Sequence, residues 1–383
     1  MNIFKQLLLL SLLCSVIASC DFDKDNTPPP AKLADFKPTV AIHPLWSVDV
    51  GSAGAGQHLN FALSQHSLRA TIFTASQSGM ITAVSAVTGQ KQWEADTHLS
   101  VTAGVALNDH QVIVVGDAGI VMALNSANGK ILWKSSVGSD ITATPAANDN
   151  TIIIKTIDGN LVSLAADNGH LLWRHTETEP SLILHAASAP QISGGSVVVG
   201  FSNGTLLRAD LANGRLNWTR DIATPKGTMS VQHMVDIAAD PIITDGHIYV
   251  ATYQGKIAAL RAETGDTEWM QDFSSHSGIA VDAGTVYGTD TNGHVVAFNR
   301  QTGELKWRQT ALADRDLSGP ALLKSNVVVG DAEGYIHILN KQDGHVIGRA
   351  QLNDSPILAT PISNGSVFYV LTQGGQLEGF SVS

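Results

Sequence analysis

The sequence predicts an all-β protein, an eight-bladed β-propeller whose blades are four-stranded antiparallel sheets. Three observations lead to this prediction. A glycine-centred unit of about 40 residues, the length of a propeller blade, recurs along most of the chain. Six of the seven tryptophans occupy one position within that unit. The unit is incomplete at both ends of the chain, and the two fragments complement each other, as in a ring whose last blade is closed by the N-terminal strand.

Residues 1–19 are predicted to be a lipoprotein signal peptide. Lys5 precedes an apolar run, Leu7 to Ile17, that is about half as long as a membrane-spanning helix must be. The run leads into Ala18, Ser19 and Cys20, a sequence that resembles the lipobox of bacterial lipoproteins. Cys20 is therefore predicted to carry the acyl chains of a membrane anchor. A secretory leader with an incidental cysteine is the alternative.

Residues 20–40 are predicted to be the lipidated cysteine followed by a flexible tether, because they combine charged residues with Pro28, Pro29 and Pro30. Asp21 directly after Cys20 resembles the signal that retains some lipoproteins in the inner membrane. The expected location is the outer membrane, facing the periplasm, with inner-membrane retention as the alternative.

Residues 41–383 are predicted to form the propeller. Each repeating unit begins with a turn glycine and an apolar strand, and the turn glycines are Gly79, Gly119, Gly159, Gly204, Gly255, Gly293, Gly334 and Gly375. A second glycine follows ten residues later, and a tryptophan four residues beyond it. The tryptophans in this position are Trp93, Trp133, Trp173, Trp218, Trp269 and Trp307. Gly348 takes the place of the tryptophan in the seventh unit, and Trp46 lies in the N-terminal fragment.

The strands within a unit are short, rich in Val and Ile, and separated by Gly, Asn and Asp. In the second unit they include Gln111–Val115, Ile120–Leu124 and Ile131–Lys134. Such runs predict successive hairpins and leave no room for helices. A tryptophan on the outermost strand of each blade is predicted to dock that blade on its neighbour, because a buried indole contributes a large apolar area.

Composition excludes several classes of function. The net charge of −11 argues against a nucleic-acid partner. Cys14 and Cys20 are the only cysteines, so neither a disulfide framework nor a CxxC site is expected. The 14 histidines show no metal-ligand spacing, and Asp21, Asp23 and Asp25 lack the glycine and final carboxylate of a calcium loop. No catalytic residue, metal or cofactor is predicted.

The repeat, clearest at residues 123–133, resembles that of quinoprotein-like propellers. This group contains the pyrroloquinoline-quinone dehydrogenases and the BamB lipoproteins of the outer-membrane β-barrel assembly machine. The lipobox, the tether, Leu45-Trp46 and residues 328–340 together resemble the BamB family. This resemblance implies a non-catalytic scaffold that docks on a POTRA domain of a BamA-like protein, and that assists nascent outer-membrane proteins. A quinoprotein dehydrogenase and an envelope propeller with another partner are the alternatives.

Two connections between units are longer than the others, and both are expected on one face of the ring. The first carries an aliphatic triplet, Leu182, Ile183 and Leu184, which is unusual in a loop. The family resemblance implies that Leu182, Leu184 and Asp236 contact the partner. His185 and Ala238 depart from the family pattern, which has Arg and Asp there. The predicted partner-binding residues are Leu182, Ile183, Leu184, His185, Asp236 and Asp240. Burial of the leucines under their own loop is the alternative.

Overall fold

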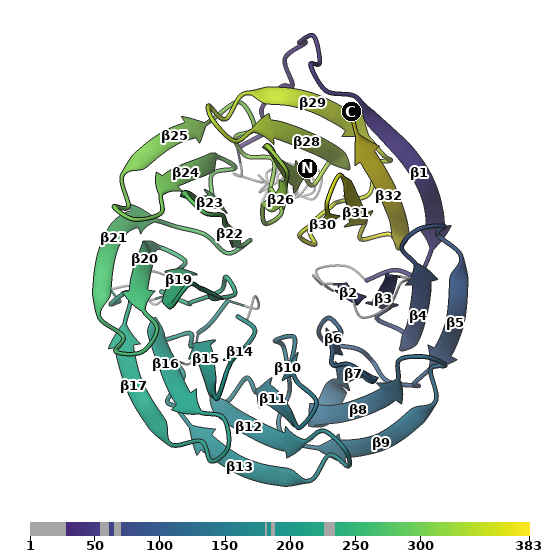
Figure 1. Cartoon of the computed structure of the whole chain (residues 1–383), viewed down its shortest axis with the longest axis vertical. Helices are drawn as coiled ribbons and strands as arrows, with labels where there is room; N and C mark the ends of the chain where they lie inside the picture. The colour runs from purple at the N-terminus through teal and green to yellow at the C-terminus, as the bar shows by residue number, and fades with distance from the viewer. Residues whose placement is uncertain (1–27, 54–60, 65–69, 181, 185–187, 226–233) are drawn as a thin grey trace, which may run out of the picture. The chain divides into compact units, whose positions relative to one another are not determined.

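The computed structural model describes residues 28–53, 61–64, 70–180, 182–184, 188–225 and 234–383. The chain divides into two units, Met1–Pro30 and Ala31–Ser383. The second unit is a ring of eight four-stranded antiparallel sheets around a common axis, which confirms the predicted fold class (Figure 1). The predicted signal peptide, Cys20 and Asp21 lie outside the described residues, as does His185.

The strands of each blade follow one another from the axis outward. The innermost strands are β2 (Ala62–Ser64), β6 (Ala106–Leu107), β10 (Ala146–Ala147), β14 (Gln191–Ser193), β18 (Ile242–Thr244), β22 (Ile279–Val281), β26 (Ala321–Leu323) and β30 (Ile362–Asn364). The second strands are β3 (Thr71–Ala75), β7 (Gln111–Gly116), β11 (Thr151–Lys155), β15 (Ser196–Gly200), β19 (His247–Ala251), β23 (Thr285–Thr289), β27 (Asn326–Gly330) and β31 (Val367–Leu371). The third strands are β4 (Met80–Ser85), β8 (Ile120–Asn125), β12 (Asn160–Ala165), β16 (Thr205–Asp210), β20 (Gly255–Arg261), β24 (Val295–Asn299), β28 (Tyr335–Asn340) and β32 (Gln376–Val382). The outermost strands are β5 (Lys91–Asp96), β9 (Ile131–Ser136), β13 (Leu171–Thr176), β17 (Leu216–Asp221), β21 (Thr267–Phe273), β25 (Leu305–Gln309), β29 (Val346–Gln351) and β1 (Ile42–Asp49).

The core lies between neighbouring blades. Strand β7 is buried along its whole length, whereas β9, outermost in the same blade, alternates between exposed and half-buried residues. One cluster joins Phe73 and Ile81 of the first blade to Val112 and Leu124 of the second. Between the second and third strands of this blade, a single 3-10 turn spans Asp117–Gly119. The Val- and Ile-rich strands therefore bury both of their faces because each blade is covered by the next.

The N-terminal strand completes the eighth blade. Strand β1 pairs antiparallel with β32, so the sheet order is β1-β32-β31-β30. In this pairing Trp46 lies opposite Gly379, and its ring stacks on Tyr369 with the centroids 5.8 Å apart. The closure predicted from the two incomplete units is therefore present in the structure.

Each tryptophan joins its blade to the next one. The Trp133 indole nitrogen donates to the Ala166 carbonyl at 2.8 Å, and the ring covers Gly169, where a Cβ would lie 2.5 Å from it. Gly169 also has a φ of +72°, which favours glycine. The other indoles bond to the next blade in the same way, from Trp46, Trp93, Trp173, Trp218, Trp269 and Trp307.

The joint between the seventh and eighth blades lacks a tryptophan, and the N-terminal segment fills it. Gly348 of β29 faces Val40, whose Cγ2 would lie 2.8 Å from a Cβ at that position. The amides of Thr39 and Val40 both donate to the Ile347 carbonyl. Residues 31–41, which we name the strap, thus lie along the seventh blade. The sequence analysis predicts a flexible tether over residues 20–40, which includes most of the strap.

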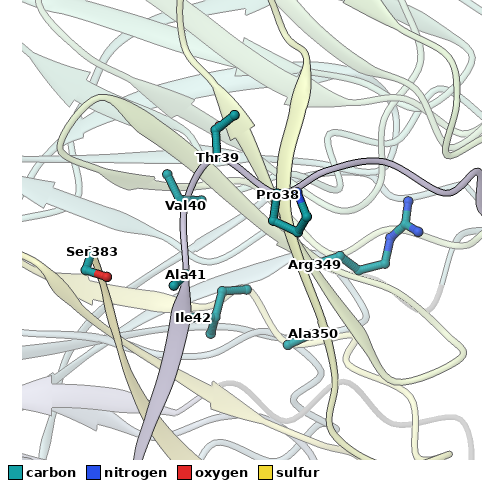
Figure 2. Close-up of a pocket in the computed structure, with 8 residues that line it drawn as sticks. All are labelled: Pro38, Thr39, Val40, Ala41, Ile42, Arg349, Ala350 and Ser383. Carbon is teal, nitrogen blue, oxygen red and sulfur yellow. The ribbon is translucent and has the colours of Figure 1, made fainter.

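Two arginines of the seventh blade hold the strap. Arg315 donates to the Ala31 carbonyl at 2.9 Å, and Arg349 donates to the Ala34 carbonyl at 3.1 Å and stacks on Phe36. A groove of about 430 Å³ remains at this joint. Figure 2 shows residues 40–42 of the N-terminal segment between Arg349 on one side and Ser383 on the other.

Candidate partner-docking surface

The two long connections run from the outermost strand of one blade to the innermost strand of the next. The first joins β13 to β14, and the second joins β17 to β18. Each connection passes the hairpin between the second and third strands of the blade that it leaves. The Glu177 amide donates to the Gly159 carbonyl of that hairpin in the third blade, and the Ile222 amide donates to the Gly204 carbonyl in the fourth. The connections therefore lie on one face of the ring, as the sequence predicts.

The aliphatic triplet of the first connection is only partly covered. Leu182 is 42% exposed, and Ile183 and Leu184 are half-buried. Leu182 therefore presents an apolar side chain to solvent, while its two neighbours pack partly against the protein. Isolated exposed leucines are common on protein surfaces, so exposure of Leu182 alone does not indicate a site. The contacts that hold this loop in place are the more specific feature.

Two carboxylates of the second connection hold the backbone of the first. Asp236 Oδ1 accepts a hydrogen bond from the Leu184 amide at 2.9 Å, and Asp240 Oδ1 accepts one from the Ala189 amide at 2.6 Å. The structure thus brings together Leu182, Leu184, Asp236 and Asp240, which are far apart in the sequence. In both hydrogen bonds a carboxylate of the second connection accepts from the backbone of the first.

Asp236 itself is inaccessible from the surface. Its exposed fraction is 1%, and Ile237 and Ala238 beside it are also buried. The family resemblance implies a direct partner contact for Asp236, whereas the structure gives it a place beneath the loop. Ala238 is likewise covered, with 6% of its surface exposed.

The surrounding protein disfavours the charged forms of these acids. Burial raises the pKa of Asp236, and its hydrogen bond from Leu184 opposes that rise only in part. Asp240 is an exposed residue, yet the protein around its carboxyl group limits hydration and raises its pKa to about 6. Both carboxylates therefore take up protons more readily than a fully hydrated aspartate does.

Sequence reasoning missed a buried lysine beneath the same loop. Lys155, at the end of β11, lies close to Glu179 in the first connection. The only signal in the sequence is a lysine that ends the aliphatic run Thr151–Ile154. Such a residue at a strand end is ordinarily solvated, so the sequence offers no reason to place it in a cluster.

Three charged or titratable residues at the seventh blade, Arg315, Asp331 and His337, bond to one another inside the protein. Arg315 bonds to Asp331 at 2.7 Å, and Asp331 bonds to His337, which is fully buried. Among the described residues, no group of three or more His, Cys, Asp or Glu is placed to hold a metal ion. Within that same part of the chain, no helix is long and apolar enough to cross a membrane.

Comparison with known proteins identifies relatives along the full chain. A family model described as outer membrane protein assembly factor BamB matches residues 77–309 and 291–383. The BamB proteins of Legionella pneumophila and Pseudomonas aeruginosa are each 42% identical to this chain. The alignments cover 98% and 99% of this chain and 99% of each relative.

Solved structures agree with this result. The crystal structure of BamB from Moraxella catarrhalis superposes with a TM-score of 0.81 at 25% identity, covering 89% of this chain and all of that one. A quinohemoprotein alcohol dehydrogenase from Comamonas testosteroni superposes with a TM-score of 0.70 at 13% identity, over 89% of this chain and 76% of that one, a likeness of fold alone. The chain belongs to the BamB family of outer membrane protein assembly factors.

Proposed function

We propose that this protein is a non-catalytic scaffold of outer-membrane β-barrel assembly, and that its two long connections dock on a POTRA domain of a BamA-like protein. In this role it assists the insertion of nascent β-barrel proteins into the outer membrane. The full-length similarity to assembly factors supports the general role. The observation that carries the docking site is the hydrogen bond from Leu184 to Asp236, which joins the two connections beneath the exposed Leu182.

The geometry suits protein docking better than catalysis. Leu182 offers an apolar anchor, and two carboxylates of the second connection hold the backbone of the first at Leu184 and Ala189. Backbone that is already held at these two positions loses less conformational entropy on binding. Interfaces commonly combine such an anchor with a polar surround.

Replacing Leu182 and Leu184 together by Asp tests the docking site. Two carboxylates at an apolar contact must be desolvated on binding, so recovery of the BamA-like protein after crosslinking and purification falls about tenfold or more. The matched control replaces Leu171 and Leu172, which are 58% and 51% exposed on β13, by Asp. This control keeps full recovery.

Three results contradict the proposal. Unchanged recovery with the Leu182/Leu184 variant, when that variant is folded, removes the site. Loss of recovery with the Leu171/Leu172 variant alone shows that the partner contacts the outer strands of the ring instead. Quinone-dependent dehydrogenase activity after addition of quinone and calcium shows that the protein is an enzyme.

We also propose that acyl chains on Cys20 hold the protein at the outer membrane, facing the periplasm. Cys20→Ala is expected to move most of the protein from the membrane fraction to the soluble periplasmic fraction, because the acyl chains are then lost. Immunoblots of separated inner membrane, outer membrane and periplasm measure this, with Cys14→Ala as the control. A Cys20→Ala protein that stays in the membrane fraction contradicts lipidation, and wild-type protein in the inner membrane identifies Asp21 as a retention signal.

A further inference from the structure

Lys155 is a buried cation where the third blade meets the fourth. Its side chain is 4% exposed, and its Nζ donates to the Gly200 carbonyl of β15 at 2.7 Å. The same Nζ lies 5.1 Å from the centre of the Phe201 ring. Burial lowers the pKa of Lys155, and the nearby carboxylates of Glu179 and Asp236 oppose this fall. The charged form of the lysine therefore depends on negative partners, because an isolated buried charge is costly.

Glu179 is the first of these partners. Its Oε1 lies 3.8 Å from Lys155 Nζ, and its side chain is 6% exposed. Its Oε2 accepts a hydrogen bond from the Ser202 amide at 2.9 Å. Glu179 lies three residues before Leu182 in the first long connection, between β13 and β14, which we name the docking loop. Its carboxylate therefore ties the start of the docking loop to the fourth blade.

Asp236 supplies a further negative charge beneath the same loop. Its Oδ1 is bonded to the Leu184 amide, while its Oδ2 is buried without a hydrogen-bond partner among the described residues. Its backbone carbonyl accepts from the Tyr253 amide of the fifth blade at 2.8 Å. The Lys155 charge opposes the rise that burial causes in the pKa of Glu179 and of Asp236.

We propose that Lys155 is a positioning residue for partner docking, one that touches no partner itself. Together with Glu179 and Asp236 it forms an ionic cluster that fixes the backbone of residues 182–184 in the docking conformation. The inference rests on the proposed function for its consequence in docking, but the positioning itself is independent of any partner.

Lys155→Met tests this positioning directly. Methionine keeps most of the aliphatic volume but removes the charge, which leaves Glu179 and Asp236 buried without a counter-charge. Hydrogen exchange of the Leu184 amide in the full chain is expected to accelerate about tenfold or more, the factor for losing a hydrogen bond to a charged group. Recovery of the BamA-like protein falls with it.

Lys341→Met is the matched control. Lys341 lies 3.3 Å from Asp282, and its Nζ is 6.0 Å from the centre of the Tyr287 ring, so it resembles Lys155 in having a carboxylate and an aromatic partner. It belongs to the seventh blade, away from the docking loop. Its replacement leaves both Leu184 exchange and recovery unchanged.

Equal Leu184 exchange in the Lys155→Met variant and the wild type overturns the inference, as does equal acceleration in the Lys341→Met control. If Lys155→Met does not fold, Glu179→Gln decides, because it removes the charge paired with Lys155 and leaves Asp236, the acceptor of the Leu184 amide, unchanged. Faster Leu184 exchange in Glu179→Gln supports the ionic cluster, and unchanged exchange refutes it.

The two proposals fail in different ways. The docking site is refuted, and the positioning is not, if Lys155→Met accelerates Leu184 exchange while both Lys155→Met and the Leu182/Leu184 variant recover the BamA-like protein in full. The positioning alone is refuted if Lys155→Met leaves Leu184 exchange unchanged while the Leu182/Leu184 variant loses recovery of the BamA-like protein.

Discussion

At the scale of single residues, the contact between an indole and a glycine explains why the tryptophan spacing is so regular. A Cβ at Gly169 would lie 2.5 Å from the Trp133 ring, and a Cβ at Gly129 would lie 2.6 Å from that of Trp93. The glycine lets the ring approach the backbone, and the indole nitrogen then reaches a carbonyl of the next blade. Each tryptophan therefore needs its own glycine one blade further along the chain.

Gly169→Ala is predicted to lower the free energy of unfolding by more than a positive φ alone explains. Gly138 is the control, since its φ is +84° and nothing lies within 4 Å of its would-be Cβ. Gly138→Ala is expected to cost about 1–2 kcal/mol, the cost of a left-handed backbone. Gly169→Ala adds about 1–3 kcal/mol from the overlap with Trp133. Denaturant unfolding measures both, and equal losses contradict the docking role of the indole.

Single residues of the docking loop are less predictable from the sequence than the ring is. The aliphatic setting of Leu182 predicts that it lies on the docking loop, and the structure shows it exposed. The family resemblance implies a partner contact for Asp236, and the structure buries Asp236 beneath the loop. The sequence does not predict the contacts of Lys155, because its partner Glu179 lies in a long connection that follows no repeat. Periodic patterns predict strands and joints, but they carry no information on how irregular loops cross one another.

At the scale of elements, the strap substitutes for the missing eighth tryptophan. Val40 packs against Gly348 and contributes to the cluster that joins the seventh and eighth blades. The sequence predicts that Gly348 interrupts the tryptophan series, and in the structure Gly348 faces Val40. The sequence does not predict what fills the joint, because a segment rich in proline and charged residues has the composition of a tether whether or not it packs on the ring.

Gly348→Ala is predicted to displace the strap. The new methyl group would lie 2.8 Å from Val40 Cγ2, so the single change is expected to cost about 1–3 kcal/mol. Val40→Ala removes the opposing methyl groups, and the double variant is therefore expected to lose less than the sum of the two single losses.

Denaturant unfolding of the two single variants and the double variant measures this coupling. Protease cleavage within residues 31–41 gives an independent reading, since a displaced strap is cut faster. Additive losses contradict a direct contact between Val40 and Gly348.

At the scale of the whole molecule, the strap and the two long connections lie at different blades of the ring. The strap runs along the seventh blade, whereas the two long connections enter the fourth and fifth blades (Figure 1). The proposed docking loop and the strap therefore use different parts of the ring.

The ring itself was the part most fully predicted from sequence. The glycine and tryptophan repeats gave the number of blades, and the complementary fragments gave the closing strand. These features repeat because every blade packs on the next one through the same type of contact. The buried charges beneath the docking loop occur once, so the repeat does not predict them.

Site-specific photo-crosslinking in living cells tests the central claim most directly. A photoreactive amino acid in place of Leu182 is expected to capture the BamA-like protein through a POTRA domain. The same amino acid in place of Leu305, which is 56% exposed on β25, is expected not to capture it. Capture from position 305 and none from position 182, with both variants folded, would contradict the account.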